Sequence, residues 1–336
     1  MTENSLVRPI KVSVIGGSGF IGTRVCSRLS KKQVDFEIID LKKSKRFPEK
    51  TKIGDVRDLS SLRAAITGNM ILNLAAVHSD DVIDKSEYYA TNVHGAENIA
   101  EIAGEKGINK IIFTSSVAVY GFANTNTGED GKIEPFNDYG ASKFNAEKVF
   151  NEWYNFGNRS LIIVRPTVVF GEGNRGNVYN LLKQISSGLF VMIGSGQNVK
   201  SIAYVENVAA FLEHCIATKK KNMLVNYVDT PDMTMQELVK FTRSLLKRRQ
   251  GLPLRLPVFL GMLLGYVSDV LRVTFRLRLP ISSIRIKKFV ATTQFSSAKH
   301  ELDDFSAPYS IKEGLRRTIE SEFLQPNPDR EIFYSE

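Results

Sequence analysis

The feature that most constrains this fold is a glycine-rich turn that follows a short apolar run near the start of the chain. Residues 12–15 are strand-like, residues 16–22 read Gly-Gly-Ser-Gly-Phe-Ile-Gly, and a helical pattern continues through Val25 and Leu29. Strand, glycine turn and helix in this order let a pyrophosphate approach the backbone at the helix N-terminus. A plain strand-to-helix connection would also fit, so the following strands decide between the two. The predicted dinucleotide contacts are Gly16, Gly19, Phe20, Ile21 and Gly22.

A second strand-like run supports the dinucleotide interpretation. Residues 36–39 read Phe-Glu-Ile-Ile and end at Asp40. An acid at this distance from the glycine turn accepts hydrogen bonds from the adenine-ribose hydroxyls, and it repels a 2′-phosphate. Asp40 therefore favours NAD over NADP, although Lys42 and Lys43 follow closely and weaken that preference.

Strands and helices continue to alternate over the first half of the chain. Residues 70–77 read as a buried parallel strand, 87–104 as a long helix, and 110–116 and 160–164 as further strands. This rhythm predicts a doubly wound parallel sheet, which we expect to be essentially complete by Gly171. Small residues end the strand at 70–77, where a cofactor can approach the backbone. The predicted contacts there are Leu74, Ala75 and Ala76.

The cysteines and the N-terminus indicate a reducing compartment. Cys26 and Cys215 are far apart in sequence, so they offer neither a disulfide framework nor metal-ligand spacing. Residues 1–9 are short and polar, and no signal peptide is visible. With 43% apolar and 24% charged residues, the composition is typical of a soluble globular protein. We therefore expect a cytoplasmic protein that binds no metal.

Two Tyr-x-x-x-Lys pairs are candidates for proton transfer. Residues four apart on a helix share a face, so we expect the ammonium of Lys143 beside the phenol of Tyr139. A free phenol has a pKa of about 10 and is a poor base at neutral pH, but a neighbouring cation favours the phenolate. Tyr179 and Lys183 have the same spacing, so spacing alone does not separate the two pairs.

Sequence context favours the first pair. Ser116 ends a predicted strand, and ligands of open α/β sheets bind at the carboxyl ends of strands. Tyr139 follows after a polar loop whose last residues, Asn137 and Asp138, are typical helix caps. Tyr179 has no comparable polar strand end before it. The predicted catalytic residues are Ser116, Tyr139 and Lys143.

Six motifs occur in the order that is typical of one family. They are Gly16-x-x-Gly19-x-x-Gly22, Asp55-Val56, Asn73-Leu-Ala-Ala76, Ser116-Val-Ala-Val-Tyr-Gly121, Tyr139-x-x-x-Lys143 and Arg165-Pro166. In these motifs the chain resembles the extended short-chain dehydrogenases/reductases of the nucleotide-sugar epimerase and dehydratase type. The resemblance implies a Rossmann-type NAD-binding domain over residues 1–172 and a smaller substrate-binding portion over 173–336, with strands partly interleaved. It also implies that NAD contacts Asp55, Val56, Tyr139, Lys143 and Pro166.

Within this family the similarity is greatest to enzymes whose amino sugar is carried by a polyprenyl diphosphate. Residues 113–121, 175–184 and 287–295 carry this closer resemblance. It implies an isomerase that interconverts N-acetylglucosamine and N-acetylgalactosamine on undecaprenyl diphosphate, for O-antigen and other surface polysaccharides. In such a reaction Tyr139 takes the proton of the sugar 4-hydroxyl with Ser116 as relay, while the C4 hydride passes to NAD and returns to the other face.

Three other interpretations stay open. A soluble UDP-N-acetylglucosamine 4-epimerase would use the same three catalytic residues. A dehydratase needs an additional acid/base pair beside the serine, and Val117 and Ala118 offer none. A non-catalytic dinucleotide-binding scaffold would not require Ser116, Tyr139 and Lys143 to be intact.

The second half offers candidate contacts for a diphosphate-linked substrate. Arg175 lies in a glycine-bearing loop and can bind a diphosphate with its forked guanidinium, or remain a solvated loop residue. In the family, an Arg-Asp pair commonly precedes an aromatic strand, and Lys200 and Ser201 stand there instead. A lysine meets a phosphate only as a point charge, so the bidentate geometry is lost. The predicted substrate contacts are Ser116, Tyr139, Arg175, Asn177 and Lys200.

The basic excess of the chain lies in one segment. Residues 240–288 contain twelve Lys and Arg and one acid, Asp269, a net charge of +11 where the whole chain has +9. Within residues 252–288, an uncharged run at 256–268 is shorter than the roughly 20 residues that span a bilayer. Apolar residues recur from Phe259 onward at helical spacing, which predicts an amphipathic helix. The opposite face carries Gly261, Gly265, Ser268, Asp269, Arg272 and Arg276.

We interpret this helix as a contact with an anionic membrane surface, which places the protein at the inner face of the bacterial cytoplasmic membrane. The alternatives are a core helix of the substrate-binding portion or the face of a homodimer. Gly261-x-x-x-Gly265 also matches a helix-packing pattern. Nucleic acid is not an expected partner, because the basic residues are interleaved with Leu and Val instead of stacking aromatics.

Overall fold

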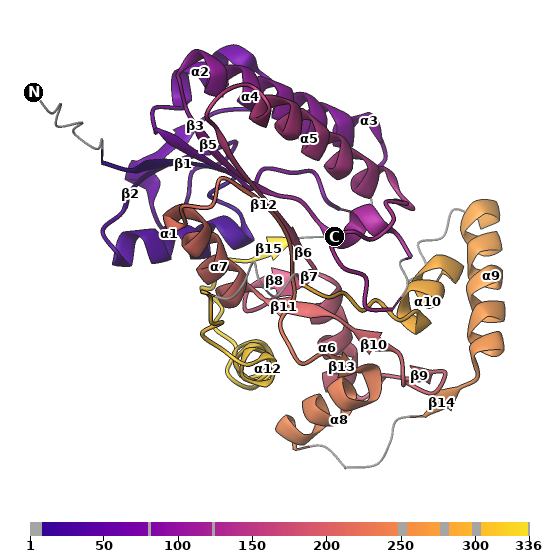
Figure 1. Ribbon diagram of the computed structural model, residues 1–336. Helices are drawn as coiled ribbons and strands as arrows, with labels where there is room; N and C mark the ends of the chain where they lie inside the picture. The colour runs from indigo at the N-terminus through magenta and orange to yellow at the C-terminus, as the bar shows by residue number, and fades with distance from the viewer. Residues whose placement is uncertain are drawn as a thin grey trace, which may run out of the picture.

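A seven-stranded parallel β-sheet is the centre of the computed structural model, which describes residues 9–79, 82–122, 125–247, 254–275, 282–297 and 304–334 (Figure 1). The strands are β1 (Lys11–Ile15), β2 (Asp35–Asp40), β3 (Thr51–Ile53), β4 (Met70–Asn73), β5 (Lys110–Thr114), β6 (Ser160–Pro166) and β12 (Asn222–Tyr227). Their order is β12-β6-β5-β4-β1-β2-β3, and every neighbouring pair is parallel. The order reverses between β1 and β4, which creates a crevice outside their carboxyl ends.

Helices cover both faces of the sheet (Figure 1). On one face α1 (Phe20–Lys31) and α7 (Val205–Ala217) bury residues such as Val25 and Phe211 against the strands. On the other face α2 (Leu59–Ala65), α4 (Gly95–Glu105) and α5 (Asp138–Tyr154) bury Leu62, Ile99 and Phe150. The predicted doubly wound, Rossmann-type sheet is confirmed.

One strand of the sheet comes from the second half of the chain. β12 pairs with β6 from Asn222 opposite Leu161 to Tyr227 opposite Pro166. The expectation that the sheet is essentially complete by Gly171 was therefore wrong. β12 covers the edge of β6, which would otherwise expose unpaired backbone groups.

The rest of the second half builds a further core from short strands and helices. Phe170, Leu182, Leu238 and Leu315 are buried in this core. Its strands are β7 (Val168–Phe170), β8 (Asn174–Arg175), β9 (Met192–Ile193), β10 (Val199–Lys200), β11 (Ile202–Tyr204), β13 (Met233–Thr234), β14 (Arg255–Leu256) and β15 (Phe333–Tyr334). Its helices are α6 (Asn177–Ser187), α8 (Met235–Leu245), α9 (Val258–Phe275), α10 (Ser283–Val290) and α12 (Ile311–Ile319). α9 stands at the edge of the molecule, beside α10 (Figure 1).

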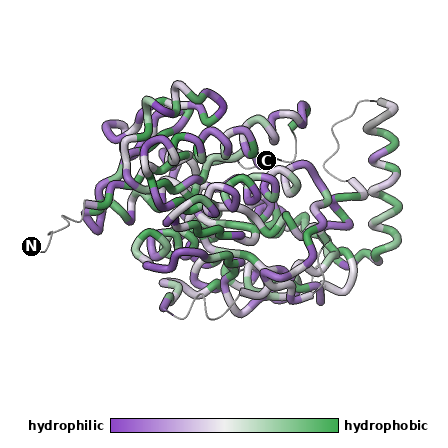
Figure 2. Tube along the Cα trace, turned by 45° about the horizontal axis from the view of Figure 1, so that its top comes forward, coloured by the Kyte–Doolittle hydropathy of each residue, from purple (hydrophilic) through white to green (hydrophobic). Residues whose placement is uncertain are grey.

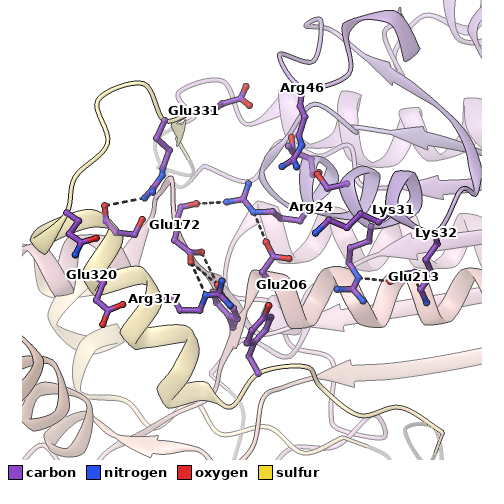
Figure 3. Close-up of a pocket in the computed structure, with 18 residues that line it drawn as sticks. Arg24, Lys31, Lys32, Arg46, Glu172, Glu206, Glu213, Arg317, Glu320 and Glu331 are labelled. Atoms are coloured by element: carbon purple, nitrogen blue, oxygen red, sulfur yellow. Dashed lines mark hydrogen bonds and ion pairs between the residues drawn. The ribbon is translucent and has the colours of Figure 1, made fainter.

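A charged cavity of about 760 Å³ lies where α1, α7 and the C-terminal residues meet (Figure 3). Arg24 of α1 forms an ion pair of 3.2 Å with Glu206 of α7 and donates to the main-chain carbonyl of Glu172 at 2.8 Å. Arg28 of α1 pairs with Glu213 of α7 at 2.5 Å. These pairs link α1 to α7, and none of the residues predicted for the active site lines this cavity. It joins the two halves of the chain instead of holding the predicted site.

A buried ion pair ties β6 to α5 near the carboxyl ends of the strands. The Arg165 guanidinium donates to both carboxylate oxygens of Glu147, at 2.8 and 2.6 Å, and both side chains are almost fully buried. Ser115 Oγ donates to the same carboxylate at 2.5 Å. Arg165 also donates to Tyr120 Oη at 2.6 Å, and that hydroxyl donates to Asn226 of β12 at 2.9 Å. Buried charges are tolerated when such a network is satisfied throughout.

We expect Arg165→Met to lower the free energy of unfolding by about 3–5 kcal/mol, because it leaves the Glu147 carboxylate buried without its cation. Urea unfolding followed by circular dichroism measures this loss. The matched control is Arg63→Met, which removes an exposed pair with Glu105 (2.7 Å) and should cost far less, because water screens an exposed pair. Equal losses in the two variants would contradict a special role for the buried pair.

Candidate active site

The glycine turn closes tightly against the end of β4. Gly16 has a φ of +80°, in the left-handed region that favours glycine. A Cβ on Gly16 would lie 2.7 Å from the amide nitrogen of Ala75, and a Cβ on Gly22 would lie 2.5 Å from the Gly16 carbonyl oxygen. The turn, the start of α1 and residues 74–76 therefore line the crevice between β1 and β4.

The N-terminus of α1 has the features of an anion-binding site. Gly19 is its N-cap residue and brings no side chain to cap the helix, so the first backbone N–H groups are left for a ligand. Asp40, at the end of β2, accepts hydrogen bonds from the backbone N–H of Ser18 at 3.0 Å and of Lys42 at 3.2 Å. These bonds hold its carboxylate beside the glycine turn, as a partner for ribose hydroxyls requires.

Asp55 and Val56 follow β3 along the same edge of the sheet. The Arg57 guanidinium holds the pKa of the Asp55 carboxyl below its usual value through hydrogen bonds of 2.7 to 3.0 Å. Val56 is buried, and its carbonyl accepts from the Asn98 side chain at 2.8 Å. A glycine cradle that a Cβ would fill, uncapped helix amides and a fixed carboxylate together fit a dinucleotide.

Helix α5 carries the predicted proton-transfer pair. Asn137 is its N-cap, with Oδ1 accepting from the backbone N–H of Gly140 at 3.0 Å. Tyr139 and Lys143 lie four residues apart on α5, so they share a face of the helix. Tyr139 is half-buried, and its ring centroid lies 6.4 Å from that of Tyr88.

A close approach between α5 and the turn after β5 brings Ser116 to the same place. Ser116 begins the 3-10 turn η3 (Val117–Tyr120), and its Oγ accepts from the backbone N–H of Ala118 at 3.1 Å. Gly140 of α5 lies against this turn, where a Cβ would overlap the Ala118 carbonyl oxygen. Glycine therefore lets α5 begin next to the serine, and the first turn of α5 holds Tyr139.

Lys143 is a buried cation whose nearest carboxylate along the helix is already engaged. Its side chain is only 2% exposed, and Nζ lies 4.3 Å from the centroid of the Phe113 ring. Glu147, one turn further along α5, is held by Arg165 and Ser115. Burial, partly offset by the charge of Glu147, lowers the pKa of Lys143 to about 7. The amine therefore titrates near neutral pH, as lysines in functional sites commonly do.

Asn92 was not among the predicted site residues, although the structure places it against α5. It lies in a π-helical turn, η2 (Tyr89–His94), and its amide forms hydrogen bonds of 2.9 and 3.0 Å with the main chain of Val77. The amide also donates to Ser142 Oγ at 2.9 Å, and that hydroxyl donates to the Tyr139 carbonyl at 2.9 Å. Asn92 thus positions the first turns of α5. π-Turns often mark functional sites, but they leave little trace in sequence periodicity.

The predicted diphosphate ligand Arg175 contacts the C-terminal part of the chain. Its guanidinium pairs with Glu322 at 2.9 Å and lies 4.0 Å from the centroid of the Tyr179 ring. Asn177 is exposed at the start of α6. Binding of substrate by these two residues stays a prediction.

Lys200 lies at the C-terminal end of α10. Its Nζ donates to the main-chain carbonyls of Lys288 at 2.8 Å and Ala291 at 2.5 Å. Burial lowers the pKa of Lys200 to about 8. A cation in this position satisfies the last carbonyls of a helix, so Lys200 holds α10 in place. Any contact with substrate would have to share this ammonium group.

The crevice thus combines a dinucleotide cradle with a phenol, a lysine and a serine hydroxyl at its edge. Such a set can move a proton at a carbinol while a bound dinucleotide exchanges a hydride. In the part of the chain that the structure describes, no group of three His, Cys, Asp or Glu side chains is placed to hold a metal ion.

Comparison with known proteins identifies the family. The model of the NAD dependent epimerase/dehydratase family matches residues 12–226, which include the whole crevice. The chain belongs to this family. NAD is accordingly the cofactor, and the resemblance inferred from the six motifs is confirmed.

Relatives within the epimerase/dehydratase family match nearly the full length. The N-acetyl-alpha-D-glucosaminyl-diphospho-ditrans,octacis-undecaprenol 4-epimerase of Escherichia coli O157:H7 is 46% identical over 97% of this chain and 99% of its own. The UDP-glucose 4-epimerase of Vibrio cholerae is 26% identical over 95% and 97%. The solved UDP-glucose 4-epimerase of Thermus thermophilus, in complex with NAD, has a TM-score of 0.71 at 19% identity over 93% and 98%. This last likeness supports the fold.

We expect Gly140→Ala to lower kcat on the order of 10- to 100-fold, because the added methyl group displaces the start of α5 from the Ser116 turn. Steady-state kinetics of epimerisation measures the effect, and the bound NAD content shows that the crevice is intact. Gly104→Ala in α4 is the control, since its Cβ would meet nothing closer than the Arg159 side chain at 3.9 Å. An unchanged kcat in Gly140→Ala would argue against this contact.

We expect Lys143→Met to abolish turnover while raising the melting temperature. Folding buries the ammonium of wild-type Lys143, and this burial lowers the free energy of unfolding. The loss is complete below pH 7, where the lysine is charged in both the folded and the unfolded state. It shrinks by about 1.4 kcal/mol per pH unit as the pH rises toward 10.5, the pKa of an exposed lysine. The difference in melting temperature between Lys143→Met and the wild type should therefore be largest below pH 7 and become smaller above it. Scanning calorimetry at about pH 6 and about pH 9.5 measures the difference.

The matched control for this pH dependence is Lys148→Met, which removes an exposed lysine from the same helix. Its melting temperature should follow that of the wild type at both pH values. A difference for Lys143→Met that does not change with pH would show that the substitution relieves something other than a buried charge.

Proposed function

We propose that this epimerase inverts C4 of N-acetylglucosamine carried on undecaprenyl diphosphate, which gives N-acetylgalactosamine. The observation that carries the proposal is the 46% identity, over 97% of this chain, to the Escherichia coli O157:H7 enzyme whose name states that substrate. The set of Ser116, Tyr139 and Lys143 at the edge of the NAD crevice supports it chemically.

Tyr139 is the proton acceptor in this proposal. Its phenolic oxygen takes the proton of the sugar 4-hydroxyl, Ser116 Oγ hydrogen-bonds the same sugar oxygen, and the charge of Lys143 favours the phenolate. When bound, NAD would supply the acceptor for the C4 hydride and the donor for its return to the opposite face of the sugar. Tyr139 then gives its proton back to O4, so the reaction needs no external oxidant or reductant. The proposed NAD contacts are Gly16, Gly19, Phe20, Ile21, Gly22, Asp40, Asp55, Val56, Leu74, Ala75, Ala76, Tyr139, Lys143 and Pro166.

The carrier of the sugar distinguishes two candidate substrates. A UDP-linked amino sugar is the second candidate, because the Vibrio cholerae relative is named a UDP-glucose 4-epimerase and matches 95% of this chain. The lipid carrier is favoured by the exposed apolar side chains of helix α9. We therefore place the enzyme at the inner surface of an anionic membrane. No helix among the described residues is long and apolar enough to cross a bilayer.

The deciding experiment incubates the purified protein separately with UDP-N-acetylglucosamine and with N-acetylglucosaminyl-diphospho-undecaprenol. We expect N-acetylgalactosamine to form mainly on the lipid carrier, because the second half of the chain presents an apolar surface near the site. Chromatography of the sugar released by mild acid measures the product. Conversion of the nucleotide sugar alone would rule out the lipid carrier.

Two tyrosine variants test the role of Tyr139 as the general base. Tyr139→Phe should lose about 10²- to 10⁴-fold in turnover, the range expected for removing a general base. Tyr179→Phe keeps the ring that lies under Arg175 and should remain active, although Tyr179 has the same spacing to a lysine. Normal turnover by Tyr139→Phe would refute the assignment.

A further inference from the structure

Helix α9 packs on the protein through its small residues. Gly261, Gly265 and Ser268 are buried, and a Cβ on Gly265 would lie 2.8 Å from the backbone of Ser283 in α10. The Gly-x-x-x-Gly pattern therefore serves a contact between two helices of one chain. The large apolar residues of α9 point away from this contact, so the alternative of a core helix does not hold.

The outer α9 face is a continuous apolar surface. Phe259 is 70% exposed, Leu263 is 58% exposed and Val270 is 63% exposed. We define the outer α9 face as Phe259, Leu263, Leu264, Tyr266, Val267 and Val270. Figure 2 shows this helix at the edge of the molecule, with hydrophobic residues coloured green along it. Single exposed apolar residues are ordinary, but a row along a whole helix marks an interaction site.

The segment of the sequence that carries α9 is strongly basic. Residues 240–288 carry a net charge of +11, and their one acid, Asp269, is turned toward α10. The Asp269 carboxylate accepts hydrogen bonds from the backbone N–H and the hydroxyl of Ser283, at 3.1 and 2.5 Å. Arg255 and Arg285, before and after α9, are exposed. The further cations Arg248, Arg249, Arg276 and Arg278 lie outside the described residues.

α10 connects α9 to the loop of the active site. Lys287 lies 5.1 Å from the centroid of the Phe122 ring, and Lys288 lies 4.9 Å from that of Phe136. The two rings are 4.9 Å apart. Phe122 follows the turn of the catalytic serine, and Phe136 precedes the Asn137 cap of α5. α9, α10 and both ends of this loop therefore form one packed unit.

We propose that the outer α9 face inserts among the acyl chains of an anionic membrane, so that α10 holds the active-site loop at the lipid surface. This inference rests on the proposed function, since a sugar anchored by an undecaprenyl chain is presented at that surface. The apolar side chains gain free energy by leaving water, and the neighbouring cations gain by approaching anionic headgroups. A second copy of the chain is disfavoured as the occupant, because it would bring a second basic segment to the same face.

The test is co-sedimentation of the purified full-length protein with vesicles of phosphatidylglycerol and phosphatidylcholine, and with vesicles of phosphatidylcholine alone. We expect binding to the anionic vesicles that weakens as salt is raised. The double variant Phe259→Gln, Leu263→Gln should reduce the bound fraction at least about tenfold. The matched control Phe156→Gln, Leu324→Gln changes a Phe and a Leu that are 69% and 48% exposed elsewhere, and it should bind like the wild type.

Measuring turnover beside vesicle binding distinguishes a failure of the membrane-docking inference from a failure of the proposed function. The α9 variant should keep its NAD and its activity on lipid-linked substrate in detergent micelles, but lose activity on substrate in vesicles. Vesicle binding through α9 without turnover of any lipid-linked sugar would uphold the docking face and refute the proposed function. Wild-type protein that ignores anionic vesicles, or an α9 variant that binds as well as the wild type, would overturn the inference. So would a wild-type dimer that the α9 variant dissociates, because a second copy would then occupy the face.

Discussion

The ion pair between Arg165 and Glu147 is the interaction on which the active site depends. It is buried, it uses two parallel hydrogen bonds, and it reaches Ser115 at the end of β5 and Tyr120 at the end of the serine turn. Either charge left alone in this place would cost several kcal/mol, so β5, β6 and α5 have one favourable arrangement. That arrangement sets the first turn of α5 against the turn that follows Ser116. Gly140 then makes the contact sterically allowed.

The same pair explains the unusual environment of Lys143. The helix places a carboxylate one turn away, but Arg165 and Ser115 already engage it, so burial lowers the pKa of the lysine to about 7. An incompletely compensated buried cation opposes folding, yet in the proposed mechanism its charge favours the ionised form of the Tyr139 phenol. If Lys143 has the proposed role, stability is given up at this position in favour of activity, which is a common relation in enzymes.

The two halves of the chain contribute differently to the enzyme. The first half carries the glycine cradle and the predicted proton-transfer residues, and the family model matches it from residue 12 onward. The second half closes the sheet with β12, joins α1 through the ion pairs around the charged cavity, and carries α9 and α10. Lys200 and the rings of Phe122 and Phe136 connect α10 to both halves. The element that we propose to meet the lipid is therefore connected, through α10, to the loop that precedes α5.

The sequence by itself determined the parallel sheet, the NAD cofactor and the helix that carries Tyr139 and Lys143 four residues apart, because these depend on turn chemistry and on spacings within one or two elements. It did not predict β12, whose short apolar run has no local sign of the edge that it covers. Nor did it predict the roles of Glu147 and Asn92, whose partners Arg165 and Ser142 are 18 and 50 residues away. Helical spacing revealed two faces of α9, but periodicity is the same whichever face points outward. Only the tertiary structure decided which face points outward. Ile193 of β9 fits closely against Gly261 and α10 fits closely against Gly265, so the large apolar side chains have no room on the inner side.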